Sequence, residues 1–517
     1  MNHHKKSLFD QLQPLKRLGE GTYGTVTLYK LPDGSQVAVK SIKSSEDGIE
    51  YSAINEINAL QSLKGCSNIV DLIEVEVKVR FDDTKTLIML PYHINDLNKF
   101  ISQTPVLERV KYFTIVFDQL IIALKHLHDR SILHLDIKPG NILVDYLYDE
   151  VSREIDLQPE CYLADFGLAK QTICLVPDKD KDMQTDYNVV TAPYRAPEIA
   201  LNQPYNYKAD VWSMGLTLLE YLTGKTIINA DSDYEIVNLI IKYAQNKNIT
   251  RKSLLQDSSI HNQIDIDVIL KKGLGPDALK MLDNIYDLRG SRAEKLGEML
   301  ELDQNNRIGV DELINFAILE DDDRLICFDK QAMPNRNHHI VSKKITYEMI
   351  YILIDWMIDV SKEFGFVTKV LIAAVDLVDR YVTNFEIIRD KLQLLGLVCI
   401  LIASKSAGDI IVDINDYVHV SDNAYTPKEI REMEVDVFKK MNYLTISCDI
   451  SPLLKVVRMR ENKSKWTNLK KLYKKVRSMG KIPAFLSYNE LAAMYTSLQS
   501  PIRSPIRSRQ SSPIRSR

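Results

Sequence analysis

The hydrophobic period of the chain changes near residue 100. Before this point, short β-branched runs surround one amphipathic stretch, Tyr51–Leu63; the runs are Val26–Tyr29, Gln36–Ile42 and Leu87–Leu90. β-Branched runs predict strands, whereas apolar residues three or four positions apart predict helices. The helical period dominates from Val106 to about Leu313, as in Tyr112–His128 and Ala209–Leu222. We therefore expect a strand-rich part with one helix, followed by a mainly helical part.

A second series of helices is expected in the last third of the chain. An acidic patch at Glu320–Asp323 and the segment Pro334–Asn337 separate it from the first part. The predicted helices span 346–362, 367–382, 388–406 and 427–441. The expected organisation is an N-terminal extension (1–14), a first domain (15–316), a linker (317–344), an all-α domain (345–445), a basic helical segment (446–499) and a disordered tail (500–517).

Composition excludes several classes of protein. The 66 Lys and Arg residues against 70 Asp and Glu give a net charge of -4, which argues against a surface built to grip nucleic acid, so no dedicated nucleic-acid site is expected. The longest apolar runs, such as Leu392–Ala403, fall short of the roughly 20 residues that cross a bilayer. The six cysteines form no CxxC pair. We expect a soluble intracellular protein without a membrane partner, in the nucleus or the cytoplasm.

A glycine-rich segment opens the first domain. Gly19-Glu20-Gly21-Thr22-Tyr23-Gly24 lies between two strand signals, and glycines let backbone N–H groups approach phosphate oxygens. Lys40 ends an apolar strand shortly afterwards. Glu56 follows in an apolar stretch, where an unpaired acid would be costly. Each feature alone also has a structural reading, as a turn or a solvated strand end, but together they predict a phosphate site with a Lys40–Glu56 ion pair.

Two further motifs make the interpretation specific. The segment His134-Leu135-Asp136-Ile137-Lys138-Pro139-Gly140-Asn141 is followed by Asp165-Phe166-Gly167 and then by Ala196-Pro197-Glu198. At these spacings, residues 15–316 resemble the eukaryotic protein kinases, and Lys138–Asn141 resembles their serine/threonine branch. The resemblance implies an α+β bilobal protein kinase fold. It also implies transfer of the γ-phosphate of ATP to a protein hydroxyl.

The resemblance assigns a role to each site residue. Asp136 would orient the substrate hydroxyl, Lys138 would steady the transferred phosphate, and Lys40, fixed by Glu56, would hold the α- and β-phosphates of ATP. The implied Mg²⁺ ligands are Asn141 and Asp165. The implied nucleotide-binding residues are Leu18, Gly19, Glu20, Gly21, Gly24, Val26, Ala38, Lys40, Leu90, Tyr92 and His93. Glu198 would pair with Arg307, and Asp210 would hold the catalytic loop. A pseudokinase is the alternative, but every ligand position is filled.

Three segments resemble the cyclin-dependent kinases in particular. Thr22-Tyr23 matches their inhibitory phosphorylation pair, Gly48–Glu56 their cyclin-binding helix, and Val189–Glu198 their substrate-side segment. Such kinases phosphorylate Ser or Thr followed by Pro, so protein substrates with Ser/Thr-Pro sites are expected. The implied enzyme is an ATP- and Mg²⁺-dependent, proline-directed serine/threonine kinase.

The chain departs from this family around the activation segment. The family cradles a phosphothreonine with three arginines, and Leu135, Asn55 and Lys170 occupy those positions here. The phosphothreonine position is Asp186, with Thr185 beside it. We therefore expect activity without an activating kinase, with Asp186 meeting Lys170. The alternative, a register shifted by one residue, leaves Thr185 as the phosphorylation site.

The second half resembles a cyclin box over about residues 345–445. The matching segments are Met349–Val360, Ala373–Tyr381, Leu392–Gly396, Leu401–Lys405 and Asp422–Thr426, followed by Met433-Glu434. One chain would thus carry a cyclin-dependent kinase and its cyclin, with residues 446–499 a remnant of a second cyclin subdomain. Lys405 and Glu434 match the residues that hold the kinase's regulatory helix, and Ile54 would enter an apolar pocket. Docking in cis and docking in trans within a dimer both remain open.

The tail repeats one short motif. Ser500, Ser504 and Ser512 each begin a Ser-Pro-Ile-Arg copy, a form that proline-directed kinases favour. We expect autophosphorylation at these serines, against low-complexity expansion or an RNA-contacting tail. The basic segment 455–481 fits a solvated helix face or an anionic partner. The alternative for the whole chain is an interaction module, in which the cyclin box binds another kinase and the attached kinase domain competes or scaffolds.

Overall fold

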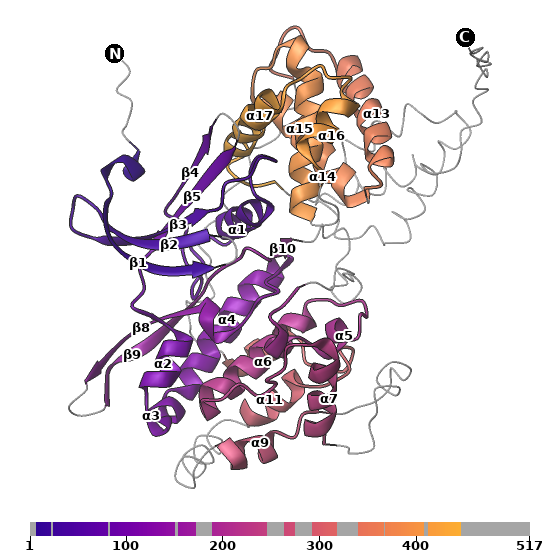
Figure 1. Ribbon diagram of the computed structural model, residues 1–517. Helices are drawn as coiled ribbons and strands as arrows, with labels where there is room; N and C mark the ends of the chain where they lie inside the picture. The colour runs from indigo at the N-terminus through magenta and orange to yellow at the C-terminus, as the bar shows by residue number, and fades with distance from the viewer. Residues whose placement is uncertain are drawn as a thin grey trace, which may run out of the picture. The chain divides into compact units, whose positions relative to one another are not determined.

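The computed structural model describes ten stretches of the chain: residues 7–21, 24–80, 83–149, 154–171, 189–245, 263–273, 292–317, 340–366, 368–407 and 412–445. All of them belong to the larger of two compact units into which the chain divides, Met1–Cys174 with Asp178–Leu453 (Figure 1). We refer to residues 7–91 as the small lobe, to 92–317 as the large lobe and to 340–445 as the helical domain. The segments 446–499 and 500–517 lie outside the described residues.

The small lobe is an antiparallel five-stranded sheet with one helix; the sequence predicted a strand-rich part with one helix. The strand order is β1-β2-β3-β5-β4, and the strands are β1 (Gln13–Gly21), β2 (Gly24–Lys30), β3 (Gln36–Ile42), β4 (Glu74–Val79) and β5 (Thr84–Pro91). Helix α1 spans Tyr51–Ser62 and lies against the sheet (Figure 1). Residues 52–61 of this helix are all buried. A helix buried on every side must have partners on every side.

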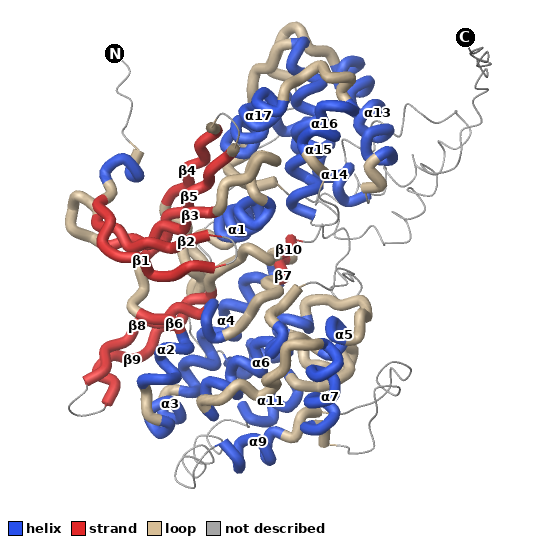
Figure 2. The backbone as a smooth tube through the Cα atoms, in the orientation of Figure 1, coloured by secondary structure: helices blue, strands red, loops and turns tan. Residues whose placement is uncertain are grey.

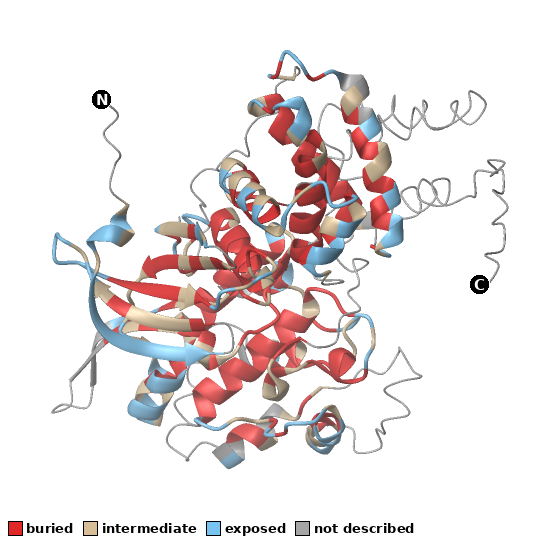
Figure 3. Cartoon of the chain, turned by 45° about the horizontal axis from the view of Figure 1, so that its top comes forward, coloured by how far each residue is buried: buried red, intermediate tan, exposed pale blue. Residues whose placement is uncertain are grey.

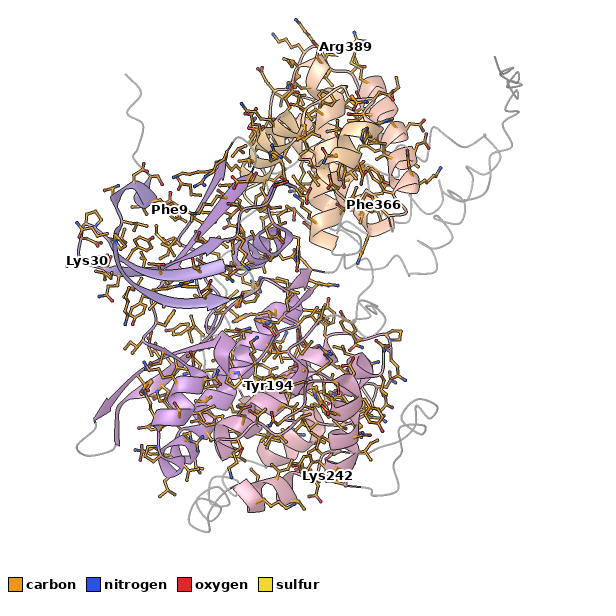
Figure 4. All side chains as sticks on the ribbon, in the orientation of Figure 1. Phe9, Lys30, Tyr194, Lys242, Phe366 and Arg389 are labelled. Carbon is orange, nitrogen blue, oxygen red and sulfur yellow. The ribbon has the colours of Figure 1, made fainter. Side chains whose placement is uncertain are left out.

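The two faces of β3 divide the small-lobe core. Val37 and Val39 join Met89 in a small cluster, and Phe9 and Leu12 of the N-terminal segment pack against it. Phe9 is labelled in Figure 4. The short 3-10 helix η1 (Leu8–Gln11) carries Phe9. Because side chains alternate along a strand, Lys40 points to the opposite face from Val37 and Val39. That opposite face is the one on which the pair with Glu56 of α1 forms.

The large lobe is mainly helical, and apolar side chains such as Phe113, Phe117 and Trp212 are buried in its core. Its helices are α2 (Leu97–Gln103), α3 (Val106–Lys111), α4 (Phe113–Asp129), α5 (Pro197–Ala200), α6 (Lys208–Thr223), α7 (Asp233–Tyr243), α9 (Ile266–Gly273), α11 (Arg292–Met299) and α12 (Val310–Ala317). Its strands were not predicted from the sequence. These are β6 (Asn95–Asp96), β7 (Ile132–Leu133), β8 (Ile142–Asp149), β9 (Glu154–Leu163) and β10 (Lys170–Gln171) (Figure 2).

The strands of the large lobe frame the predicted catalytic residues. β8 and β9 pair antiparallel, and β6 adds to β8 to make a three-stranded sheet. β7 and β10 form a separate pair, with Gln171 opposite Ile132. The short 3-10 helix η2 (Pro139–Asn141) lies just before β8. β6, β7 and β10 have two residues each, which is too short to give a period in the sequence, so the helical period is the stronger signal in this part of the chain.

The helical domain contains α13 (Tyr347–Glu363), α14 (Thr368–Asn384), α15 (Leu392–Ala407), α16 (Ile414–Val420) and α17 (Pro427–Lys440). The four predicted helices are present. The 3-10 turn η5 (Arg389–Lys391) and the start of α15 replace the predicted start at 388, and α16 was not predicted. α15 is apolar nearly all round and packs against α13, α14 and α17. Within the described part of the chain, no helix is long and apolar enough to span a membrane.

Candidate active site

Three charged side chains meet between the small lobe and the large lobe. The Nζ of Lys40 lies 2.7 Å from Glu56 Oε2 and 2.7 Å from Asp165 Oδ1. Lys40 comes from β3 and Glu56 from α1, whereas Asp165 follows β9, so three elements must be placed correctly for the cluster to form. The structure thus brings together the predicted Lys40–Glu56 pair and the predicted metal ligand Asp165.

Burial and charge shift the proton affinities of this cluster. Burial alone would lower the pKa of Lys40, but Glu56 and Asp165 outweigh it and raise that pKa above its ordinary value. Burial also raises the pKa of Glu56, to about 7, against the opposing charge of Lys40. Burial alone would raise the pKa of Asp165, but Lys40 outweighs it and the pKa is lowered. Asp165 therefore stays ionised, as a cation ligand must.

The catalytic loop is hydrogen-bonded to the side chain of Asp210, as predicted. The Asp210 carboxylate accepts hydrogen bonds from the backbone N–H of His134 (2.7 Å) and of Leu135 (2.9 Å). Leu135 and Asp165 both adopt positive φ, 61° in each case. Such backbone strain in non-glycine residues collects at functional sites, where the surrounding structure enforces it. The Asp210 bonds supply part of that enforcement.

Asp136 lies at the centre of a polar cluster. Lys138 Nζ lies 2.8 Å from Asp136 Oδ2, and Asn141 Nδ2 donates to the same oxygen and to the Asp136 carbonyl at 2.8 Å each. The Thr191 hydroxyl donates to Asp136 Oδ1 (2.5 Å) and accepts from Lys138 (2.8 Å). Sequence reasoning did not name Thr191, although it lies inside the quoted segment Val189–Glu198. Asp136 is thereby fixed in one orientation with its carboxylate fully hydrogen-bonded.

The glycine-rich segment forms the hairpin between β1 and β2. A Cβ on Gly24 would lie 2.2 Å from the Ser41 carbonyl oxygen, so close packing against β3 requires this glycine. Gly19 and Gly21 have open space around them instead, which suits close approach of a ligand. β1 is exposed along its length, including Leu18 and Glu20 (Figure 3).

The other expected nucleotide contacts lie on the strands beneath this hairpin and just after them. Ala38 on β3 is the Cα partner of Leu90 on β5, and both side chains are buried. Val26 lies on β2, opposite Lys40 on β3. Tyr92 and His93 follow β5 directly. The His93 ring is held by Asp145 at 2.8 Å, so the contact that we expect from His93 is through its backbone.

The loop before α1 is hydrogen-bonded to the helical domain. The Glu434 carboxylate accepts from the backbone N–H of Ile49 (2.9 Å) and from Lys405 (2.7 Å), and Lys405 also donates to the Asp47 carbonyl oxygen (2.7 Å). Burial raises the pKa of Glu434, and Lys405 opposes the rise. Ile54 of α1 is fully buried. Lys405 and Glu434 are thus brought together beside the loop before α1, and the apolar pocket expected for Ile54 stays a prediction.

Two hydrogen bonds of this interface and the role of Gly48 were not predicted from the sequence. The Asp47 carboxylate accepts from the backbone N–H of Ile414, and Arg431 donates to the Glu46 carbonyl oxygen (2.7 Å). Gly48 has a φ of 94°, and a Cβ there would lie 2.1 Å from Glu434 Oε2. Gly48 stood inside the quoted helix signature, but only the structure shows that its missing side chain makes room for Glu434.

The segment after the activation loop has an unusual backbone. Val190 adopts a φ of 66°, which is strongly disfavoured for a β-branched residue. Arg195 holds it there, since Nη2 donates to the Val190 carbonyl oxygen (2.8 Å) and Nη1 binds Asp233 (2.5 Å). The expected Glu198–Arg307 pair is bidentate, at 2.7 and 2.9 Å, and is buried. These pairs fix the floor on which a peptide would lie.

Seven of the predicted regulatory residues lie outside the described residues. These are Thr22, Tyr23, Thr185, Asp186, Ser500, Ser504 and Ser512. The expected Asp186–Lys170 contact and the basic segment 455–481 are outside them as well. Their roles stay predictions.

Comparison with known proteins divides the chain in the same way. The protein kinase domain family matches residues 12–317, which contain Lys40, Asp136 and Asp165, and the cyclin N-terminal domain family matches residues 324–445, which contain Lys405 and Glu434. A probable CTD kinase subunit alpha homolog of Encephalitozoon cuniculi is 27% identical over 317 residues, 61% of this chain and 86% of that protein. Cyclin-dependent kinase 4 of Xenopus laevis is 32% identical over 240 residues, 44% of this chain and 68% of that protein. A solved CAK complex of Chaetomium thermophilum bound to ATP-gamma-S matches at 26% identity and a TM-score of 0.44, over 59% of this chain and 90% of that one.

Proposed function

Because the chain belongs to the protein kinase family, as a serine/threonine kinase followed by a cyclin domain, we propose that it is a proline-directed enzyme activated by its own cyclin domain. One observation carries this proposal. Lys40 lies 2.7 Å from both Glu56 and Asp165, while the loop before the helix of Glu56 is hydrogen-bonded to Glu434 and Lys405. The groups that serve ATP are thus assembled in a state in which the helical domain holds α1.

The donor set fits Mg²⁺ and ATP, which the family uses. Both hydrogen bonds that the structure describes for the Asn141 side chain use its Nδ2, so Oδ1 is left for a cation. Asp165 keeps one carboxylate oxygen beyond the one that Lys40 takes. An amide oxygen and a carboxylate are ligands that Mg²⁺ prefers, and the bound ion would neutralise charge on the ATP phosphates. Lys40 would bind the α- and β-phosphates.

Asp136 would orient the substrate hydroxyl and accept its proton. Thr191 donates to Oδ1 of the carboxylate, and Lys138 and Asn141 donate to Oδ2, so its direction is fixed before the substrate arrives. Positioning of this kind, rather than covalent chemistry, is what phosphoryl transfer demands of the protein. Lys138, beside Asp136, would also steady the charge of the transferred phosphate.

The helical domain would act on α1 of the same chain. The Lys405 and Glu434 contacts fix the loop 46–49, and a fixed loop holds the first turn of α1 and with it the direction of Glu56. A covalent tether raises the effective concentration of the partner toward the millimolar range. Docking in cis would therefore keep the kinase poised without a separate activator.

Val190 and Arg195 support a preference for proline after the phosphorylated residue. Most residues at that substrate position carry a backbone N–H that needs an acceptor. The Val190 carbonyl oxygen is turned by its positive φ and is already bonded to Arg195. Proline has no N–H to leave unsatisfied, so it would lose nothing at this site. Ser500, Ser504 and Ser512 each precede a proline, which makes the tail a candidate substrate.

A peptide assay tests the proposal. Purified protein with ATP and Mg²⁺ is expected to phosphorylate a Ser-Pro-Ile-Arg peptide much faster than its Ser-Ala-Ile-Arg counterpart, and Asp136→Asn is expected to abolish transfer. Mass spectrometry of the same reaction should find phosphate on Ser500, Ser504 or Ser512. Equal rates on the two peptides would refute the proline preference. Transfer by neither wild type nor variant would instead favour the interaction module.

A further inference from the structure

Helix α1 makes a second connection to the helical domain, on the side away from Lys40. Asn58 lies two residues after Glu56, about 200° further round the helix, and is buried. Its Oδ1 accepts a hydrogen bond from the backbone N–H of Thr445 (3.1 Å), at the end of the described helical domain. Its Nδ2 donates to Gln171 Oε1 (2.9 Å) on β10, the strand that begins the activation segment. One amide thus bridges three parts of the chain.

The Thr445 end of this bridge is held in place by its neighbours. Arg380, paired with Asp376 at 2.8 Å, donates to the Leu444 carbonyl oxygen (2.9 Å), and the Thr445 hydroxyl lies 3.0 Å from that of Ser406. Arg380 and Asp376 are almost completely buried, so the backbone that presents the Thr445 N–H is rigidly held.

The Gln171 end is fixed by its strand. Gln171 is paired with Ile132 of β7, and its Nε2 donates to the Arg130 carbonyl oxygen (3.4 Å). The Asn58 amide therefore joins two fixed points, one in each domain.

The neighbouring positions cannot do this work with charge in the way that the cyclin-dependent kinases do. A phosphate cradle needs several cations, but of its three positions only Lys170 carries a charge here, because Leu135 is a fully buried leucine and Asn55 is neutral. A phosphate brought against Leu135 would be desolvated without compensation. Something other than three arginines must tie α1 to the start of the activation segment.

We propose that Asn58 is the positioning residue that couples the docked cyclin domain to the activation segment, through the path Thr445–Asn58–Gln171. With Thr445 in place, both ends of the Asn58 amide are satisfied, and β10 is held beside α1. Without the Thr445 N–H, Asn58 loses one hydrogen-bond partner, and its amide is no longer held in the orientation that binds Gln171. The path gives the activation segment its cyclin dependence without a phosphate. This inference rests on the proposed function.

Four variants of the intact protein test the coupling. Gln171→Leu is expected to lower kcat/KM for a Ser-Pro-Ile-Arg peptide about tenfold, the value of one buried hydrogen bond, and Asn58→Leu, which loses two hydrogen bonds, at least as much; KM for ATP should change less than about twofold in both. The kcat/KM of the double variant is expected to be no lower than that of the less active single variant, because both substitutions break the Asn58–Gln171 contact. Thr104→Val is the control, since this buried hydroxyl lies just after α2, outside the cyclin-binding segment, and has no partner among the described residues.

Several results would overturn the inference. Wild-type kcat/KM in Asn58→Leu, additive losses in the double variant, or a rate that falls when phosphatase removes phosphate from Thr185 would each do so. If Asn58→Leu does not fold, Gln171→Glu against Gln171→Leu decides, because glutamate keeps an acceptor for Asn58 Nδ2 and should retain most of the rate; equal losses would contradict the bridge. An inactive wild-type protein would refute the proposed function instead.

Discussion

The Glu434 carboxylate accepts a hydrogen bond from the backbone N–H of Ile49, 385 residues earlier in the chain, at 2.9 Å. The bond is buried, and the same carboxylate binds Lys405. Because Ile49 lies two residues before α1, this one contact fixes the start of the helix that carries Glu56. A carboxylate of the cyclin domain is thus linked, through one short helix, to the lysine of the ATP site.

Gly48 provides a way to break this contact without touching the catalytic residues. Gly48→Ala would place a Cβ 2.1 Å from Glu434 Oε2, so the carboxylate or the loop must move. We expect kcat/KM for a Ser-Pro peptide to fall about 5- to 150-fold, the usual range for coupling between two sites. The measurement is steady-state transfer by the intact protein.

Gly34→Ala is the matched control for Gly48→Ala. Its φ of 93° imposes the same backbone strain as the 94° of Gly48, but the nearest atom to an added Cβ is the flexible end of Lys30, 4.0 Å away. Similar losses in both variants would show that strain, and not the Glu434 contact, lowers the rate.

Val190→Gly is expected to weaken the preference for proline. Glycine adopts negative φ as readily as positive, so the carbonyl at 190 could turn away from Arg195 toward the substrate. The ratio of rates on Ser-Pro and Ser-Ala peptides should fall about fivefold to tenfold, in line with the roughly 1 to 1.5 kcal/mol of one hydrogen bond. A ratio equal to that of wild type would mean that the Val190 carbonyl does not set the preference.

Asp165→Asn is expected to reduce the rate about 10²- to 10³-fold, since it weakens the site for the Mg²⁺ that would neutralise charge on the reacting phosphate. It should also raise the Mg²⁺ concentration that gives half-maximal rate. Chelation of Mg²⁺ should abolish transfer by wild type. Asp129→Asn on the surface of α4 is the control, and its Mg²⁺ dependence should match that of wild type. An unchanged Mg²⁺ requirement in Asp165→Asn would contradict the assignment of this carboxylate as a metal ligand.

Glu56 is expected to set the acid limb of the pH profile. Burial raises its pKa from 4.5 to about 7, so below about pH 7 it is protonated and no longer attracts Lys40 by charge. The value of kcat/KM for ATP, which reports ionisations of the free enzyme, should therefore rise as the pH increases through about 7. Glu56→Gln should be slower and lose this limb. The same limb in Glu56→Gln would assign it to another group.

The contribution of Glu56 to the stability of the fold should fall as the pH rises, whereas kcat/KM should rise. Between about pH 4.5 and 7 the folded protein holds a proton on Glu56 that the unfolded chain has released. The Glu56 contribution to the free energy of unfolding therefore declines as the pH rises through this window. Denaturant titration of wild type and Glu56→Gln should show wild type losing more stability over that range.

The sequence predicted the elements and pairs that repeat a known pattern. Strands β2, β3 and β5 and the long helices followed from the sequence pattern, and so did the Lys40–Glu56 pair. The Glu198–Arg307 pair and the role of Asp210 followed from the resemblance to the protein kinases. The second resemblance matched Lys405 and Glu434 to residues that hold the regulatory helix, and both are hydrogen-bonded to the loop just before α1. These features depend on residue type at a fixed spacing, which a sequence displays directly.

The remaining features depend on geometry that spacing does not carry. The positive φ of Val190 is opposed to the preference of valine, so no local rule predicts it. Asn58 meets Thr445 across 387 positions, and neither residue type suggests the other. Helix α16, of seven residues, is too short to show a period.

The central claim is that the cyclin domain assembles the ATP site of its own chain. The most direct test compares kcat of the intact protein with that of residues 1–317 alone, on the same Ser-Pro peptide at saturating ATP and Mg²⁺. The account predicts a fall of about 100-fold or more, with recovery when residues 318–517 are added as a separate protein. Equal rates for residues 1–317 and for the intact chain would contradict it.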